Sequence, residues 1–225
     1  MFTNREEAGL LLAKRLGAYR GRPNALILAL PRGGVAVGYS LSLALRLPLD
    51  VFITRKLGAP DNPEYAIGAV TETGSVFLNP EARAVLEAVS FSSGDLNKMI
   101  RAQREEIARR QGLYRGGRAL PTLRERTVLL VDDGIATGAT FLASAKALKG
   151  LGVQRLVGAV PVGPPDTLRL ARREVDELVV LMTPEPFFAV GNHYLDFAQV
   201  DDAAVIQYLE RAVSALRASS QPSHA

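Results

Sequence analysis

The residue types best suited to chemistry gather in one segment, VLLVDDGIATGAT, which runs from Val128 to Thr140. Four apolar residues end in two adjacent carboxylates, Asp132 and Asp133, and a loop rich in glycine and threonine then leads into a predicted helix. Glycines let backbone amides approach a phosphate, threonine hydroxyls add donors, and the N-terminus of the next helix offers unpaired N–H groups. The carboxylates would repel a phosphate, but they can accept hydrogen bonds from two vicinal hydroxyls. The pattern therefore predicts a site for ribose 5-phosphate, with the phosphate bound by Gly134, Ile135, Ala136, Thr137, Gly138, Ala139 and Thr140.

Three other interpretations of this segment fit less well. Asp132 and Asp133 could simply cap a helix behind an ordinary glycine turn, but the whole string behind a buried strand is more specific than a lone DDG. A nucleotide P-loop needs a lysine next to its final serine or threonine, and Ala139 occupies that place. A dinucleotide-binding fingerprint also fails, because no G-x-G-x-x-G opens the first helix.

With two acidic residues and a T-G-x-T loop behind an apolar strand, the segment resembles the signature of the type I phosphoribosyltransferases. The resemblance extends over most of the chain. It is closest to an uncharacterised branch of predicted phosphoribosyltransferases in which PRGG, RKLG and DDGIATGAT occur together. Resemblance to this branch does not indicate a substrate. The resemblance implies a type I phosphoribosyltransferase-like α/β fold: a mostly parallel sheet flanked by helices, with a helical insertion and a small hood.

The resemblance gives a role to a second segment, ALPRGGVAVG, which follows the first predicted strand. In the family, the loop in this place binds diphosphate. Arg32 is suited to clamp phosphate oxygens, and Gly33 and Gly34 would expose amides in a conformation that side chains would obstruct. The alternative interpretation is a plain strand-to-helix turn.

A third segment, TRKLGAPDNPEYAIGAV, follows the second predicted strand and has the glycine and proline punctuation of a mobile lid. In the family, the equivalent loop closes over the diphosphate during catalysis. Arg55 and Lys56 are therefore the candidates to neutralise the leaving group, and Glu64 or Tyr65 could orient them. An ordinary loop is the alternative, and it carries more weight for Glu64 and Tyr65.

In the family, a hood formed by both chain ends covers the acceptor, and Pro184 to Asp202 is the corresponding segment here. His193 could act as a base near neutral pH, although a lone histidine among aromatic residues is more often structural. Aromatic faces in the segment could stack a planar acceptor, with packing against the sheet as the alternative; they belong to Phe187, Phe188, Tyr194 and Phe197.

The resemblance implies transfer of a phosphoribosyl group from 5-phosphoribosyl 1-diphosphate, with Mg²⁺ as cofactor, to a nucleobase-like or amine acceptor that the sequence does not identify. Asp132 and Asp133 would contact the Mg²⁺ directly or through water, and would form the catalytic set with Arg55 and Lys56. Two alternatives stay open: a non-catalytic regulator that senses the donor, and a hydrolase that uses water as acceptor. An intact PRGG and lid favour an enzyme, since a sensor need not eject diphosphate. Dimers are common among relatives, so a homodimer is expected by analogy.

These segments need a frame, and the hydrophobic pattern predicts one. Short apolar runs bounded by turns indicate buried strands at 25–30, 49–53, 127–133 and in RLVGAVPV and ELVVLM. Helical patterns lie at 5–19, 35–45, 139–151, 167–173 and 201–216, and a hairpin is predicted over 66–78. Strands that alternate with helices indicate a mostly parallel sheet. Charged helical patterns over about 80–117 form the insertion, whose solvated face we expect to carry Arg101, Arg104, Arg109 and Arg110.

The composition bounds the remaining possibilities. A length of 225 residues with 48% hydrophobic content suits one domain, which we expect to span 1–225. The net charge is only +4 and no block of five or six basic residues occurs, so nucleic-acid binding gains little support. The absence of cysteine excludes disulfides, thiolate metal sites and a cysteine nucleophile. No apolar run reaches about 18 residues, so we expect a soluble cytoplasmic protein with small-molecule partners and no membrane contact.

Overall fold

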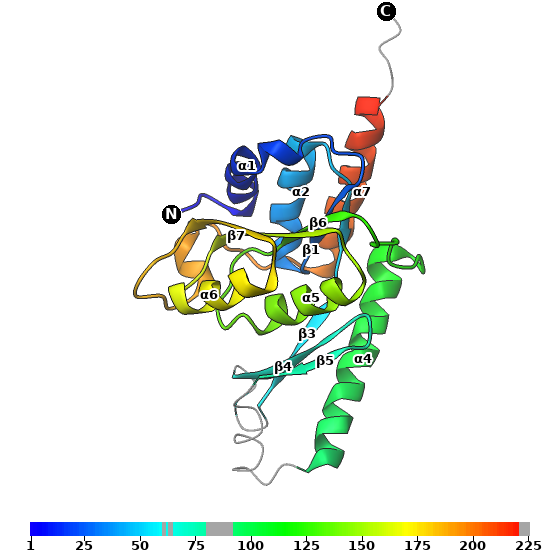
Figure 1. Ribbon diagram of the computed structural model, residues 1–225, viewed down its shortest axis with the longest axis vertical. Helices are drawn as coiled ribbons and strands as arrows, with labels where there is room; N and C mark the ends of the chain where they lie inside the picture. The colour runs from blue at the N-terminus through cyan, green and yellow to red at the C-terminus, as the bar shows by residue number, and fades with distance from the viewer. Residues whose placement is uncertain (60–61, 63–64, 80–91, 221–225) are drawn as a thin grey trace, which may run out of the picture.

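A five-stranded sheet forms the centre of the protein (Figure 1). The computed structural model describes residues 1–59, 62, 65–79 and 92–220. The strands lie in the order β2-β1-β6-β7-β8, and every pairing between them is parallel. Their bounds are β1 (Ala25–Ala29), β2 (Leu49–Val51), β6 (Thr127–Val131), β7 (Arg155–Val162) and β8 (Glu177–Met182). The predicted mostly parallel sheet flanked by helices is confirmed.

Helices cover both faces of this sheet, as Figure 1 shows. One layer contains α1 (Arg5–Arg15), α2 (Gly33–Leu45) and α7 (Asp202–Ser220), and the other contains α5 (Ala139–Gly150) and α6 (Pro165–Glu174). Every residue of β1 is buried, with Ile27 in the first core and Leu26 and Leu28 in the second. A strand buried on both faces reads as a continuous apolar run, which is why the pattern was visible in the sequence.

A second, antiparallel sheet contains β3 (Thr54–Gly58), β4 (Ala66–Thr71) and β5 (Val76–Leu78). The hairpin predicted over 66–78 corresponds to β4 and β5, and the segment proposed as a lid begins with a third strand that the sequence pattern did not predict. Thr54–Gly58 is a strand, because its backbone pairs with that of Ala66–Thr71 and the side chain of Leu57 is fully buried. The two adjacent charges of Arg55 and Lys56 masked this strand in the sequence.

The long helix α4 (Ser93–Arg115) packs against β3 and β4, which contact α5 as well. Its N-cap is Ser92, whose side chain accepts a hydrogen bond from the backbone N–H of Asp95. The first part of the predicted insertion, and Glu64, lie outside the described residues.

The remaining described segments are two short 3₁₀ helices, η1 (Gly17–Tyr19) and η2 (Val190–His193). The helix predicted over 5–19 therefore ends at Arg15, and a separate turn follows it. Within the described ranges, none of the helices combines the length and the apolar character that a membrane span requires.

Candidate functional site

The segments PRGG and DDG meet at the carboxyl ends of β1 and β6. These two strands are parallel neighbours, with Ala29 opposite Val131, and the N–H of Leu30 donates to the carbonyl of Val131 over 2.8 Å. From β1 the chain turns to β2 on one side, whereas β6 leads to β7 and β8 on the other. The strand order thus reverses between β1 and β6, and this is where open α/β sheets bind ligands.

Gly33 lies directly against the carboxylate of Asp133. A Cβ at Gly33 would come within 1.9 Å of Asp133 Oδ2, so glycine is required for the two loops to approach this closely. Gly34 stands in the same way beside the backbone of Asp132. The glycines of PRGG therefore have a packing role that the sequence interpretation did not include.

Both aspartate carboxyls are pushed toward protonation by their surroundings. Burial raises the pKa of Asp132, and the adjacent charge of Asp133 raises it further. Burial also raises the pKa of Asp133, against the opposing effect of Arg5, whose Nε donates to Asp133 Oδ2 over 2.7 Å. The Arg5 guanidinium also donates to the carbonyl of Ala198 over 2.9 Å, so it joins the site to the hood segment.

The predicted phosphate loop lines a cavity of about 250 Å³. Its wall consists of residues 136–141 together with Asp132 and Lys56, so β3 brings a cation to the cavity from the second sheet. Gly138 is the N-cap of α5 and has φ +80, a left-handed conformation that favours glycine. The amides at the start of α5 thus lie beside a cavity with one basic side chain, which suits a phosphate monoester.

Individual residues of the loop differ in what they offer to a ligand. Ala136 and Thr137 are exposed and Thr140 is half-buried, whereas the side chain of Ile135 is buried in the core. Gly134 is buried as well, with the side chain of Val190 against it. Ile135 and Gly134 therefore shape the loop from behind, and of these two only the backbone could face a ligand.

Arg32 and Arg55 lie toward α4 and α7 rather than toward the phosphate loop. Arg32 Nη1 is 3.8 Å from Asp202 Oδ1, and Arg55 Nε donates to Gln103 Oε1 over 3.0 Å. Arg55 and Lys56 therefore point to different parts of the site, as alternate residues of a strand do. Tyr65, proposed to orient them, has a side chain that is 45% exposed.

The interpretation of the α4 arginines as one solvated face needs a correction. Arg101 and Arg104 are exposed, as expected. Arg110 is buried, with its Nε donating to Glu106, and Arg109 pairs with Asp202 at the start of α7. Helical spacing turns Arg110 toward β3, and a charged residue that faces a neighbouring element cannot be recognised from a charge pattern alone.

The role proposed for Tyr194 in stacking an acceptor does not fit the structure. Its side chain is buried, packs between Phe2 and Phe197, and donates its hydroxyl to the carbonyl of Asp133 over 2.6 Å. Phe197 has its ring under the Arg5 guanidinium, whose carbon lies 3.8 Å from the ring centroid. These aromatic residues therefore join the hood to the site instead of presenting a free face.

The other predicted acceptor residues lie elsewhere in the hood segment. The ring of Phe187 stacks on His193 at 5.4 Å, while Phe188 is 79% exposed. His193 Nε2 is buried and has no hydrogen-bond partner among the described residues, so this nitrogen makes no hydrogen bond to either aspartate.

The sequence pattern did not point to Arg5, to the buried position of Arg110 or to Tyr114, whose hydroxyl donates to Asp202 Oδ1 over 2.6 Å. One signal for Arg5 was present: a cation in the first turn of a helix is disfavoured by the helix dipole, so another partner had to hold it there. The contacts of Tyr114 and Arg110 depend on where α4 packs, which the sequence pattern did not specify.

Comparisons with known proteins identify the family of this chain. The phosphoribosyl transferase domain family matches residues 6–194. Two Mycobacterium tuberculosis proteins, from strains CDC 1551 and H37Rv, have names that give phosphoribosyl transferase as a provisional assignment. Each is 40% identical over 212 residues, which make up 94% of this chain and 47% of theirs. The chain thus spans about half the length of these curated relatives.

Solved structures show the same fold. The crystal structure of TT1426 from Thermus thermophilus is 39% identical in sequence, covers 93% of this chain and 98% of its own, and superposes with a TM-score of 0.76. AQ2163 from Aquifex aeolicus, at 10% identity and a TM-score of 0.51, covers 91% of this chain and 84% of its own, and shows the fold alone. Because the family model matches most of its length, the chain belongs to the phosphoribosyl transferase domain family.

Proposed function

We propose that the protein transfers a 5-phosphoribosyl group from 5-phosphoribosyl 1-diphosphate to a nucleobase-like or amine acceptor and releases diphosphate. The proposal rests on one observation: the predicted phosphate loop and the PRGG loop, both suited to bind anions, come together at Asp132 and Asp133. Asp132 lines the cavity formed by the predicted phosphate loop and Lys56, and the glycines of the PRGG loop lie against Asp132 and Asp133. A donor with a phosphate at one end of a ribose and a diphosphate at the other matches this arrangement.

The residues present also fit Mg²⁺, which the family implies. Asp132 and Asp133 are adjacent part-buried carboxylates with raised pKa values, and Arg5 pairs with Asp133, an arrangement that favours a further positive charge beside the two. The described residues include no group of three or more side chains that could hold a metal by themselves. Asp132 and Asp133 would therefore share the ion with oxygens of the donor and with water, as Mg²⁺ sites at phosphates commonly do. When bound, the ion would neutralise charge on the diphosphate.

The protein's own contribution to this reaction would be positioning and electrostatic stabilisation. The bond from the ribose C1 to the diphosphate oxygen breaks, the acceptor nitrogen bonds to C1, and the acceptor gives up a proton to the released diphosphate or to water. Positive charge then develops on the ribose ring and negative charge on the diphosphate. Asp132 and Asp133 would hold the ribose hydroxyls, while Arg32, Arg55 and Lys56 would stabilise the growing negative charge with donors already in place.

A release assay tests the proposed reaction. Protein, Mg²⁺ and 5-phosphoribosyl 1-diphosphate are incubated with a panel of nucleobases and amines, and free diphosphate is measured. Release that requires one acceptor class would support transfer. Equal release in the absence of any acceptor would favour hydrolysis, and no release under any condition would favour a donor-binding regulator.

A variant pair tests the site itself. We expect Asp132→Asn with Asp133→Asn to abolish donor binding while the fold, followed by circular dichroism, is preserved. Asp166→Asn is the matched control, because Asp166 is a carboxylate on the surface of α6 whose side chain is 88% exposed. Calorimetry that finds the donor affinity of the double variant unchanged would contradict the assignment.

A further inference from the structure

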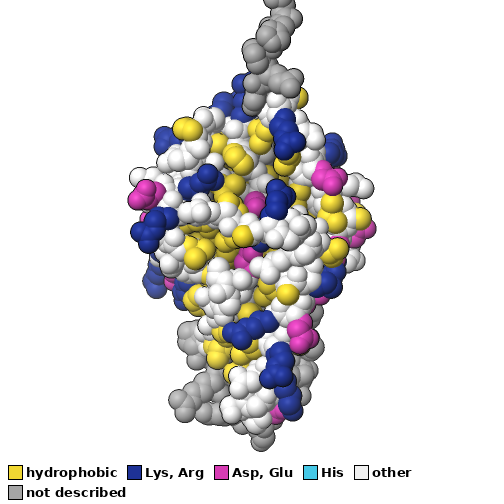
Figure 2. Space-filling model, turned by 90° about the vertical axis from the view of Figure 1, so that its right-hand side faces the viewer, with side chains coloured by type: hydrophobic (Ala, Val, Ile, Leu, Met, Phe, Trp, Pro, Cys, Tyr) yellow, Lys and Arg dark blue, Asp and Glu magenta, His cyan; other side chains and the backbone are white. Residues whose placement is uncertain are grey.

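Four arginines gather where α4 passes β3 and the start of α7: Arg32, Arg55, Arg109 and Arg110. Figure 2 shows this side of the molecule, where basic side chains lie among acidic and hydrophobic ones. In the described part of the chain, the carboxylates paired with these guanidinium groups are those of Glu106 and Asp202. The cluster therefore holds more positive than negative charge.

Arg110 occupies the middle of the α4 face that looks into this cluster. Gln103 and Tyr114 lie on the same face, because spacings of seven and four residues return to one side of a helix. Gln103 accepts the hydrogen bond from Arg55, and Tyr114 donates to Asp202 over 2.6 Å.

Asp202 is in turn 3.8 Å from Arg32. On α4, Arg110 thus lies between Gln103, which binds Arg55, and Tyr114, which is linked to Arg32 through Asp202. Electrostatics agrees with this placement: burial lowers the pKa of Arg55, and the charges of Arg110 and Arg32 lower it further.

The side chain of Arg110 is mostly buried, but the two terminal nitrogens of its guanidinium group are available to a ligand. Its side chain is only 9% exposed, and its Nε donates to Glu106 Oε1 over 2.7 Å. Its two terminal nitrogens donate to no oxygen of the described residues. These nitrogens are not fully buried, however, because the single fully buried side-chain polar atom without a partner among the described residues is His193 Nε2. The terminal nitrogens of Arg110 must therefore keep contact with solvent. Such an arginine is held in place by the protein and still has donors for a ligand.

The neighbouring Arg109 differs in this respect. Its Nε and Nη2 donate to Glu106, its Nη2 also donates to Asp202, and its side chain is 48% exposed. Hydrogen bonds, above all from Arg109, lower the pKa of Glu106 to about 2, so Glu106 stays ionised at neutral pH. Arg109 thus supplies much of the charge that Glu106 needs.

We infer that Arg110 is a third diphosphate-binding arginine, which acts together with Arg32 and Arg55, so that α4 contributes directly to the substrate site. The inference rests on the proposed function for the identity of the ligand. A diphosphate carries several oxygens, and a planar guanidinium with two free nitrogens can bind two of them at once. In the free protein, the carboxylates of Glu106 and Asp202 compensate part of the charge that the diphosphate would meet.

The test compares two ligands that represent the two ends of the donor. Affinities for inorganic pyrophosphate and for ribose 5-phosphate, both with Mg²⁺, are measured by calorimetry on the full chain. We expect Arg110→Met to weaken pyrophosphate binding by about ten- to a hundred-fold and to leave ribose 5-phosphate binding unchanged. Arg110→Lys, which keeps the charge but not the planar fork, should fall between wild type and Arg110→Met. Arg101→Met on the exposed side of α4 is the matched control.

The outcomes separate this inference from the proposed function. Unchanged pyrophosphate affinity in folded Arg110→Met or Arg110→Lys, equal losses for both ligands, or no pyrophosphate binding by the wild type would each overturn the role of Arg110. If the variants keep their pyrophosphate affinity but the wild type transfers phosphoribosyl groups, only the role of Arg110 is wrong and the proposed function stands. If the variants lose pyrophosphate selectively but the wild type transfers nothing, the proposed function fails and the anion site remains.

Discussion

Asp132 and Asp133 follow β6 without a spacer, and burial raises the pKa of both carboxyls. A carboxyl with a higher pKa in the folded than in the unfolded protein opposes folding wherever the unfolded form is ionised, that is, above its ordinary value of 3.8. The loss of stability is absent at the lowest pH and grows as the pH rises from 3.8 through the folded-state pKa. Buried charges that oppose folding in this way are common at functional sites, where a bound ligand can compensate the charge.

The free energy of unfolding should therefore respond to Asp132→Asn in a pH-dependent way. We expect the variant to be more stable than the wild type near pH 7, because the amide removes both the buried charge and its repulsion of Asp133. The difference should shrink as the pH is lowered, since the wild-type carboxyl then becomes neutral as well. Urea unfolding at a series of pH values measures it, with Asp166→Asn as control; a constant difference would show that the carboxyl titrates normally.

At the scale of elements, α4 is held to the sheets by a buried ion pair near its C-terminal end. Arg115 donates from Nη1 to Glu72 Oε2 over 2.5 Å and from Nη2 to Glu72 Oε1 over 2.9 Å, and both side chains are 2% exposed. Arg115 also donates from Nε to Asp50 on β2 over 3.1 Å. One side chain thus joins the long helix to the turn between β4 and β5 and to the edge of the parallel sheet.

Removing one partner of this pair should destabilise the protein strongly. We expect Arg115→Met to lower the free energy of unfolding by about 3–5 kcal/mol, because it leaves Glu72 buried without its cation. Lys98→Met is the control on the same helix: Lys98 pairs with Asp95 at the surface and is 82% exposed, so its loss should have no measurable effect. Similar chemical denaturation midpoints for the two variants would contradict the anchoring role.

The elements also show which parts of the protein were predictable from the sequence. Strands β1 and β6 were found because two-sided burial produces unbroken apolar runs, and the helix behind TGAT was found because its loop has a distinctive composition. β3 was missed because its pairing with β4 is not encoded in its own residues. The positions of Arg5 and Arg110 were missed for a related reason: Arg5 bonds to Asp133, 128 residues away, and the burial of Arg110 depends on how α4 packs against other elements.

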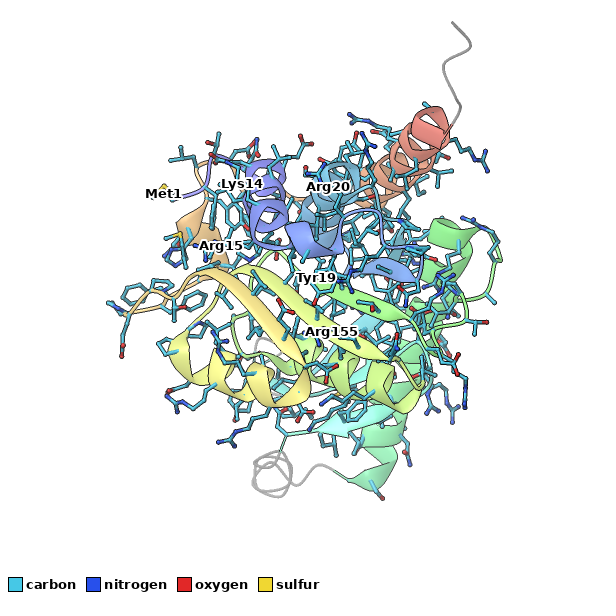
Figure 3. The ribbon with its side chains drawn as sticks, turned by 45° about the horizontal axis from the view of Figure 1, so that its top comes forward. Met1, Lys14, Arg15, Tyr19, Arg20 and Arg155 are labelled. Atoms are coloured by element: carbon cyan, nitrogen blue, oxygen red, sulfur yellow. The ribbon has the colours of Figure 1, made fainter. Side chains whose placement is uncertain are left out.

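At the scale of the whole molecule, the two ends of the parallel sheet differ in character. At the end where the strands begin, the Tyr19 hydroxyl donates to Glu177 over 2.6 Å, and Arg155 donates to both of these side chains. Figure 3 shows Tyr19 close to Arg155, with Lys14, Arg15 and Arg20 on the same side of the molecule. The three groups of this network satisfy one another. At the opposite end, Arg5, Arg110 and the aspartates have charge or donors to offer a ligand.

The first residues of the chain connect to the same functional end through the hood segment. The N–H of Phe2 donates to the carbonyl of His193 over 2.8 Å, and the N–H of Leu195 donates to the carbonyl of Phe2 over 2.8 Å. The ring of Phe2 is buried against Tyr194, whose hydroxyl donates to the carbonyl of Asp133. A continuous set of contacts therefore runs from Phe2 through Tyr194 to the acidic pair.

Replacing Phe2 should consequently affect both stability and ligand binding. We expect Phe2→Ala to lower the free energy of unfolding by about 3 kcal/mol, the lower end for a buried phenylalanine, because the hood can partly close the space. Donor affinity should fall as well, since Tyr194 loses the ring that holds it below Asp133. Leu195→Ala is the matched control, as Leu195 lies in the same segment but is 72% exposed. Urea unfolding and calorimetry with 5-phosphoribosyl 1-diphosphate measure the two effects. A stability loss without any change in donor affinity would show that the hood is fastened by Phe2 but does not position Asp133, and the coupling between the chain's first residues and its site would then be wrong.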